Sequence, residues 1–209
     1  MRQQNKALEH LQSIKIRDEY GTPKKLFEIA CNEHDIHPTI DICASDANHV
    51  LDNYITKKDD CFKQIITEPF FMNPPYSKVS EFMKFAYDLH VKRNLDALIL
   101  VYAKTGVGWW HDHVVGKAEI HYVKGRIKFL DENGKIPTWC KTCKRKYSGV
   151  KTCPNIHCVC KDCEIKYPKK YTSDKICPKC HKLTIELYEK TTENTAPYDS
   201  CWIIYRTKK

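Results

Sequence analysis

The stretch Pro69-Phe70-Phe71-Met72-Asn73-Pro74-Pro75-Tyr76 is the most informative part of this 209-residue chain. Its apolar run is followed by two prolines, which lack the N–H that a β-ladder needs and which fix φ. The sequence therefore predicts a buried strand that ends in a rigid, extended turn. Open α/β sheets bind their ligands at the carboxyl ends of their strands. At such an edge the Asn73 amide, the Pro74 carbonyl and the Tyr76 ring would suit a flat group with an exocyclic amine, such as adenine.

Apolar runs on both sides of this stretch predict the remaining elements. Thr22 can cap a helix whose first position is Pro23, and apolar residues at helical spacing from Val79 predict a second helix. A short helix is expected over 109–115. The expected strands are 39–43, an edge element near 54–55, 70–72, 96–103, 119–123, 126–130 and 200–205. Alternating strands and helices predict the α/β class, with a parallel sheet that is completed by antiparallel strands.

A cysteine-rich segment interrupts the last part of this pattern. Without it, residues 126–134 would run directly into residues 196–206, so the segment reads as an insertion in a loop. We expect one domain made of residues 1–134 and 196–209, with an inserted module over 135–195. After residue 133, the Asn133-Gly134 pair predicts a turn.

Charge is concentrated in the insertion. Residues 135–190 hold 14 Lys and Arg against 5 Asp and Glu, and this surplus equals the +9 net charge of the whole chain. A local basic surplus indicates a polyanionic partner. There is no run of 18 apolar residues, and the first 20 residues lack an apolar signal core. We therefore expect no membrane span, no secretion and an intracellular, cytoplasmic protein.

Eight of the twelve cysteines lie within the insertion, and the other four have apolar neighbours typical of buried cysteines. CxxC pairs in a chain without a signal peptide indicate metal ligands rather than disulfides. Four ligand pairs predict two structural Zn²⁺ ions: Cys140 and Cys143, Cys153 and His157, Cys160 and Cys163, and Cys177 and Cys180. Cys158 is left over or replaces His157. The order resembles the cross-braced RING pattern, and a pair of zinc ribbons with other pairings is equally compatible with the spacing.

Beyond these separate motifs, the chain resembles the phage-type DNA N6-adenine methyltransferases, the Dam family of class I, Rossmann-like enzymes. The resemblance covers residues 18–133 and 196–206. It rests on the order of Thr22-Pro23 with Leu26-Phe27; Ile40-Asp41-Ile42-Cys43-Ala44 with Asn48; Thr56 with Asp59-Asp60; Asn73-Pro74-Pro75-Tyr76-Ser77; Trp109-Trp110-His111; Ala118-Glu119 followed by Gly125-Arg126-Ile127-Lys128-Phe129; and Ala196-Pro197-Tyr198.

This resemblance implies S-adenosylmethionine as cofactor, double-stranded DNA as partner, and roles for particular residues. Asn73, Pro74, Pro75 and Tyr76 resemble the catalytic motif. Asp41 resembles the acid beside the methionine and ribose of the cofactor, and Thr22 with Pro23 resembles the element that holds its carboxylate. Asp60 or Asp59 resembles the acceptor for the cofactor's adenine amino group. Cys43, Ala44 and Ser45 stand where a Gly-x-Gly loop would be usual after the first strand, and the resemblance implies that Cys43 and Ala44 lie beside the cofactor. The alternative for the three aspartates is a solvated surface carboxylate.

The predicted function is therefore transfer of a methyl group from S-adenosylmethionine to the exocyclic amine of an extruded adenine in duplex DNA. Lys144, Arg145, Lys146, Lys169 and Lys170 suggest that the insertion contacts DNA phosphate, or else they form a solvated surface. Two alternative functions stay open. One is methylation of RNA or of a protein glutamine amide, and the other is a zinc-dependent nucleic-acid-binding or adaptor protein with an inactive enzyme domain. No protein partner is evident from the sequence.

Overall fold

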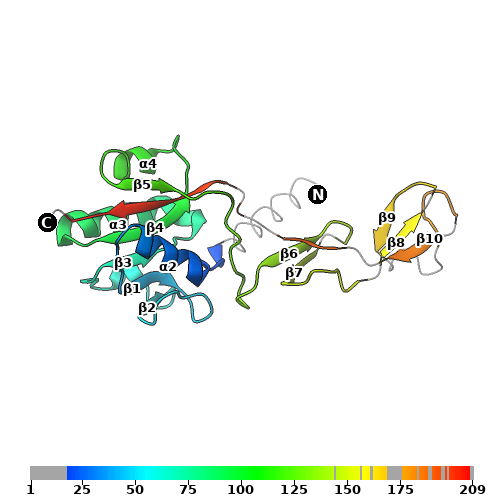
Figure 1. Cartoon of the computed structure of the whole chain (residues 1–209), viewed down its shortest axis with the longest axis horizontal. Coiled ribbons are helices and arrows are strands. Elements are labelled where there is room, and N and C mark those ends of the chain that lie inside the picture. Colours follow the sequence, from blue (N-terminus) through cyan, green and yellow to red (C-terminus); the bar gives the residue numbers. More distant parts are fainter. Residues whose placement is uncertain are drawn as a thin grey trace. The chain divides into compact units, whose positions relative to one another are not determined.

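The computed structural model describes residues 18–143, 145–155, 157–160, 162–168, 176–182, 184–187, 190–193, 196 and 198–207. The chain divides into two compact units, residues 1–134 with 195–209, and residues 135–194 (Figure 1). No helix among the described residues is long and apolar enough to cross a membrane.

A six-stranded sheet forms the centre of the first unit. Its order is β2-β1-β3-β4-β12-β5, and the first four strands are parallel, whereas β12 runs antiparallel to both β4 and β5. The strand bounds are β1 Ile40–Ala44, β2 Tyr54–Thr56, β3 Phe70–Met72, β4 Ala97–Tyr102, β5 Glu119–Tyr122 and β12 Ser200–Tyr205. This mixed α/β architecture with a mostly parallel sheet is consistent with the class I methyltransferase fold that the resemblance implies.

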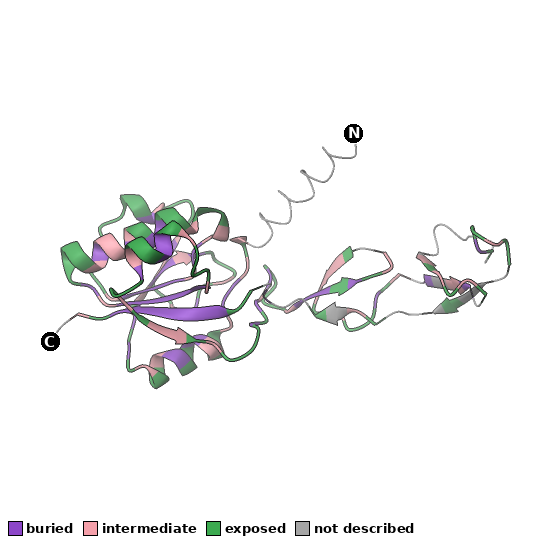
Figure 2. Cartoon of the chain, turned by 90° about the horizontal axis from the view of Figure 1, so that it is seen from above, coloured by how far each residue is buried: buried purple, intermediate pink, exposed green. Residues whose placement is uncertain are grey.

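Helices cover both faces of this sheet (Figure 2). On one face α3, Val79–Arg93, and α4, Gly108–His113, pack against inward side chains such as Ile99 and Ile203. On the other face α2, Lys24–Glu33, packs against neighbours in the same strands, such as Leu100 and Ile204. Because successive strand residues point to opposite faces, strands buried on both faces must be apolar throughout. All six residues of β4 and all six of β12 are accordingly buried.

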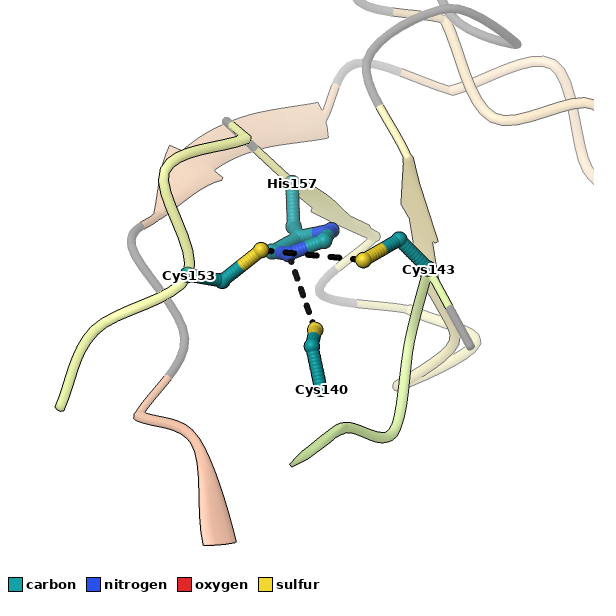
Figure 3. A group of neighbouring side chains, drawn as sticks. All are labelled: Cys140, Cys143, Cys153 and His157. Atoms are coloured by element: carbon teal, nitrogen blue, oxygen red, sulfur yellow. Dashed lines mark hydrogen bonds between the residues drawn. The ribbon is translucent and has the colours of Figure 1, made fainter. Parts of the chain in front are cut away.

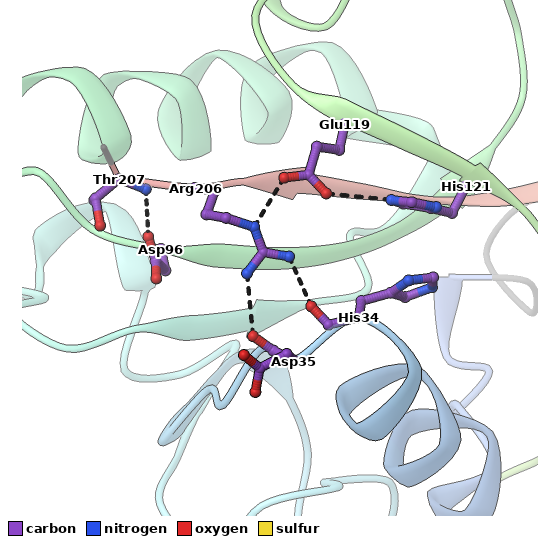
Figure 4. Close-up of polar contacts among 7 residues, drawn as sticks. All are labelled: His34, Asp35, Asp96, Glu119, His121, Arg206 and Thr207. Atoms are coloured by element: carbon purple, nitrogen blue, oxygen red, sulfur yellow. Dashed lines mark hydrogen bonds and ion pairs between the residues drawn. The ribbon is translucent and has the colours of Figure 1, made fainter. Parts of the chain in front are cut away.

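Arg206, directly after β12, ties the end of this strand to its neighbours (Figure 4). Its Nε donates to Glu119 Oε1 at 2.8 Å, and its two terminal nitrogens donate to the carbonyl oxygens of Asp35 and His34 at 3.1 and 2.7 Å. The backbone N–H of Thr207 donates to Asp96 Oδ1 at 2.6 Å. These contacts join β12, β5 and the end of α2, so the antiparallel strand is held in register from both sides.

Two local expectations are wrong. Residues 126–130 do not form a strand; Leu130 makes only an isolated bridge with Gly21, and the Ile127 carbonyl accepts a bond from Ala196. Their alternating pattern arises because Ile127 and Phe129 are buried with α2 on one face of the sheet. Thr22 does not cap α2, since Pro23 occupies the N-cap position and no side chain caps this helix. The Asn133-Gly134 turn is present, with Gly134 at φ 67°.

The second unit contains two antiparallel three-stranded sheets. One has the order β11-β6-β7 and the other β10-β8-β9. The bounds are β6 Pro137–Cys140, β7 Arg145–Ser148, β8 His157–Cys160, β9 Lys166–Pro168, β10 Thr184–Leu187 and β11 Thr192–Glu193. Among the side chains that the structure describes in this unit, the fully buried ones include Cys140, Cys153, Cys160, Cys177 and His157. The interior of this unit is thus built from metal-ligand residues rather than large apolar ones.

Candidate active site and zinc centres

Asn73 follows β3 at the carboxyl edge of the parallel strands. Its Nδ2 donates to the carbonyl oxygen of Tyr20 at 3.3 Å and to Thr22 Oγ1 at 3.1 Å. Its Oδ1 is buried and has no hydrogen-bond partner among the described residues. A buried acceptor without a donor costs roughly 1–3 kcal/mol, and such a group in a folded protein requires an explanation. Here the geometry leaves one strong acceptor for a hydrogen-bond donor other than the described residues.

The next residues form a rigid turn, as the two prolines predict. Pro74 is buried, and Pro75 is extended, with φ −60° and ψ 124°, just before a 3-10 helix η2 at Tyr76–Lys78. The Tyr76 ring stacks face to face on Tyr102, with centroids 3.8 Å apart and 6° between the ring planes. Burial raises the pKa of Tyr76 well above its ordinary value, so its hydroxyl stays neutral. Tyr102 ends β4 and was not singled out from the sequence.

Residues 18–22 lie against both ends of this turn. Besides the two contacts to Asn73, the Asp18 carboxylate accepts from the Ser77 backbone N–H at 3.1 Å and from Ser77 Oγ at 2.5 Å. Gly21 and Leu130 exchange two backbone hydrogen bonds of 2.8 and 2.9 Å. Sequence reasoning missed Asp18 and Tyr20, because their partners lie more than 50 residues away and no local pattern marks such a pairing.

The carboxylate of Asp41 is committed to the chain's own backbone. Asp41 lies second in β1 rather than at its end, is only 2% exposed, and accepts from the N–H groups of Cys43 and Val50 at 3.2 Å each. Burial raises the pKa of Asp41 to about 6. Its side chain therefore shapes the loop that follows β1. Cys43, half-buried, and Ala44, buried, complete the strand at the same edge.

Asp59 and Asp60 follow β2, and each has a local partner. Asp59 accepts from the backbone N–H and the Oγ1 of Thr56 at 3.1 and 2.6 Å, and these hydrogen bonds lower its pKa. Asp60 has φ 57° and accepts from the Phe62 N–H. Lys63 lies 2.9 Å from its carboxylate and lowers the pKa of Asp60. Asp59 is exposed and Asp60 half-buried.

A family model for DNA N-6-adenine-methyltransferase (Dam) matches residues 10–146, a range that includes Asn73, Tyr76, Tyr102 and the three aspartates at this edge of the sheet. The chain belongs to the Dam family. Membership supports DNA adenine methyltransferase activity and DNA as the substrate of this chain. No curated protein and no solved structure gives a match.

In this Dam-family chain, the insertion brings eight predicted zinc ligands into two groups. The first contains Cys140, Cys143, Cys153 and His157, whose ligand atoms lie within 4.8 Å of one another. Cys140 Sγ lies 3.3 Å from His157 Nε2, and Cys143 Sγ lies 3.6 Å from Cys153 Sγ. Figure 3 shows the four side chains pointing toward a common centre. Four ligands around Zn²⁺, with Zn–S bonds of about 2.3 Å, would place sulfurs roughly 3.8 Å apart. The group fits a tetrahedral structural site.

The second group contains Cys160, Cys163, Cys177 and Cys180, again within 4.8 Å, with 3.4 Å between the sulfurs of Cys160 and Cys180. Consecutive ligand pairs thus share a centre. The cross-braced alternative, in which the first and third pairs share one ion, is not adopted. Strand β8 contributes to both groups, because His157 at its start belongs to the first group and Cys160 at its end belongs to the second. The side chain of Cys158 lies outside the described part of the chain.

Two polar side chains surround the first group. The Tyr147 hydroxyl lies 3.3 Å from the sulfurs of both Cys143 and Cys153, and Asn155 Nδ2 donates to that hydroxyl at 2.7 Å. Hydrogen bonds of this kind orient metal ligands. Neither residue was identified from the sequence, because cysteine spacing carries no signal for its surroundings.

The predicted DNA-contacting residues are only partly described. Arg145 is exposed and Lys146 half-buried, at the start of β7. Lys144, Lys169 and Lys170 lie outside the described residues, as does Pro197 of the motif around Tyr198.

Proposed function

We propose that this Dam-family protein transfers a methyl group from S-adenosylmethionine to N6 of an adenine that has left the stack of duplex DNA. The observation that carries the proposal is the buried Asn73 Oδ1, which has no hydrogen-bond donor among the described residues and lies beside an extended proline turn. An N6 amine offers two N–H donors, one for this oxygen and one for the Pro74 carbonyl.

Those two acceptors address the main difficulty of the reaction. The lone pair of an exocyclic amine is delocalised into the ring, which makes the nitrogen a poor nucleophile. Hydrogen bonds to Asn73 Oδ1 and the Pro74 carbonyl favour a pyramidal nitrogen and stabilise the positive charge that develops on it. S-adenosylmethionine supplies an electrophilic methyl group on a sulfonium; the N–C bond forms as the C–S bond breaks, and the amine then loses a proton to solvent. Asn73 and Pro74 hold the nitrogen in position for this displacement.

Three features of the residues around the site fit the methyl donor, S-adenosylmethionine. Helix α2 begins without a capping side chain and without an acidic residue in its first turn, so its N-terminal N–H groups suit a carboxylate. Cys43 and Ala44 end β1 with small side chains at the same sheet edge. The Asp60 carboxylate pairs with Lys63, a solvent-exposed lysine, and would accept a hydrogen bond from the adenine amino group of S-adenosylmethionine. Asp59 suits this role less well, because its carboxylate accepts hydrogen bonds from Thr56.

Tyr76 would hold the extruded base. Base–aromatic stacking contributes about 1–3 kcal/mol, which offsets much of the few kcal/mol that unstacking a base costs. Because Tyr102 already stacks on one face of Tyr76, the base would use the opposite face.

The insertion would fold around two structural Zn²⁺ ions and contact DNA phosphate through its basic side chains. The eight ligands support the first part and the charge surplus supports the second. Metal binding supplies the folding energy of small modules with few apolar residues.

The test is to incubate the protein with S-adenosylmethionine labelled in its methyl group and with duplex DNA, RNA or a protein mixture. Nucleoside analysis of the DNA should give labelled N6-methyladenine. The matched Asn73→Ala variant should bind the donor in calorimetry as the wild type does, and its methylation rate should fall by at least about 100-fold, because it loses a preorganised dipole. Label only in RNA or protein, or full activity of the variant, would refute the proposal.

A further inference from the structure

The two ends of the Asn73 amide have different roles, and the surrounding contacts determine which end faces which way. The carbonyl of Tyr20 can only accept a hydrogen bond, so the amide atom 3.3 Å from it must be the nitrogen. The oxygen is therefore turned to the other side, where it is buried and has no partner in the part of the chain that the structure describes. A rotated amide would present N–H groups to the substrate amine, which also offers N–H groups, and no hydrogen bond could form.

Thr22 provides the second contact that holds this orientation. Its side chain is 5% exposed, and its Oγ1 accepts from Asn73 Nδ2 at 3.1 Å. The hydroxyl is available for this contact because it does not cap α2.

The backbone around Thr22 is anchored on both sides. Gly21 is bridged to Leu130, and a Cβ atom on Gly21 would lie 2.7 Å from the Asn48 Cβ, so only glycine permits this approach. Asp18 binds Ser77 at the far end of the turn. The anchored backbone fixes the position of the Thr22 hydroxyl relative to Asn73.

We propose that Thr22 is a positioning residue, which fixes the Asn73 amide with its oxygen toward the methylation pocket. This role rests on the proposed function and is additional to any contact between Thr22 and the donor's carboxylate. It acts through Asn73, not through the reacting atoms.

The experiment compares Thr22→Val, which keeps the shape of the side chain and removes the hydroxyl, with Thr22→Ser, which keeps the hydroxyl. Thr39→Val is the matched control, because it removes a hydroxyl that binds Glu68 at 2.7 Å just before β1, at the opposite edge of the sheet. Single-turnover methylation of duplex DNA is measured at saturating donor, and donor affinity is measured by calorimetry. A second readout is solvent exchange of the Asn73 side-chain NH₂ signals in NMR spectra, identified by their disappearance in Asn73→Ala.

We expect Thr22→Val to methylate about tenfold more slowly, as loss of one hydrogen bond implies, with donor affinity within about twofold of the wild type. Exchange of the Asn73 NH₂ should become faster. Thr22→Ser and Thr39→Val should behave as the wild type in all readouts. A wild-type rate in Thr22→Val or an equally slow Thr22→Ser would overturn the role. If the wild type makes no N6-methyladenine, the proposed function fails, whereas unchanged NH₂ exchange in Thr22→Val overturns the orienting contact itself.

Discussion

Asn73 and Tyr76 are each partly committed to the folded chain and partly left for a ligand. The Asn73 nitrogen has two partners and its oxygen has none among the described residues. One face of the Tyr76 ring is stacked on Tyr102. Side chains that are fixed before a ligand arrives lose less entropy on binding. At the scale of the residue, the side chains of this turn are therefore already fixed for a flat base that donates hydrogen bonds.

The role of a single residue could be interpreted from the sequence only where its constraint is local. Asn73-Pro74-Pro75-Tyr76 could be interpreted because its constraint is local: two prolines after an apolar run allow few backbone paths. The partners of Asp41, Asp59 and Asp60 could not be predicted, because a carboxylate that binds its own loop and one that binds a ligand look alike in sequence. In the structure each of the three has a partner within nine residues. Their roles toward a donor remain part of the proposal.

At the scale of elements, prediction succeeded where burial leaves few alternatives. The strands at 70–72 and 200–205 have the predicted bounds, and β4 differs from the predicted 96–103 by one residue at each end. Continuous apolar runs of this length are typical of strands covered on both faces. The predicted strand at 126–130 was wrong because alternating buried side chains do not require a strand. They also arise in an irregular segment that packs beside a helix and makes a single β-bridge. Ile127 and Phe129 are buried in that way.

The pairing of the zinc ligands gives an element-scale prediction. Cys143 and Cys153 belong to one group, so the double variant Cys143→Ser/Cys153→Ser should lose one of two bound zinc ions. The matched double variant Cys143→Ser/Cys163→Ser removes a ligand from each group and should lose both. Zinc content of the purified proteins, measured by atomic absorption, checks both. In a cross-braced module the outcome would be reversed: the first variant would lose both ions and the second only one.

At the scale of the whole molecule, chemistry and charge lie in different units. The carboxyl-edge site belongs to residues 1–134 with 195–209, whereas the basic surplus lies within residues 135–190. The sequence indicates an insertion here because its cysteines and lysines change the composition abruptly. The partners of its side chains could not, because they depend on three-dimensional folding around the metal.

This division predicts a change in salt dependence when charges of the insertion are removed. Arg145→Ala/Lys146→Ala should bind DNA more weakly, and the slope of log K against log salt concentration should become shallower by up to about two, since each lost phosphate contact releases one counterion fewer. Lys84→Ala/Lys92→Ala, which removes two lysines that pair with Asp88 on α3, is the control of equal charge and should keep the wild-type slope. DNA binding measured from low to physiological salt tests this. An unchanged slope in the Arg145/Lys146 variant would remove the support for phosphate contacts there.

The central claim is that two fixed oxygens position an adenine amine against a sulfonium methyl group. The most direct measurement is a crystal structure of the protein with S-adenosylmethionine bound. A hydrogen bond of about 3 Å and a reacting distance of about 3–3.5 Å together place Asn73 Oδ1 and the Pro74 carbonyl oxygen within roughly 6 Å of the methyl carbon. The account predicts both oxygens inside that distance, facing a space that a base can enter. Oxygens farther away, or covered by packed side chains while the donor is bound, would contradict it.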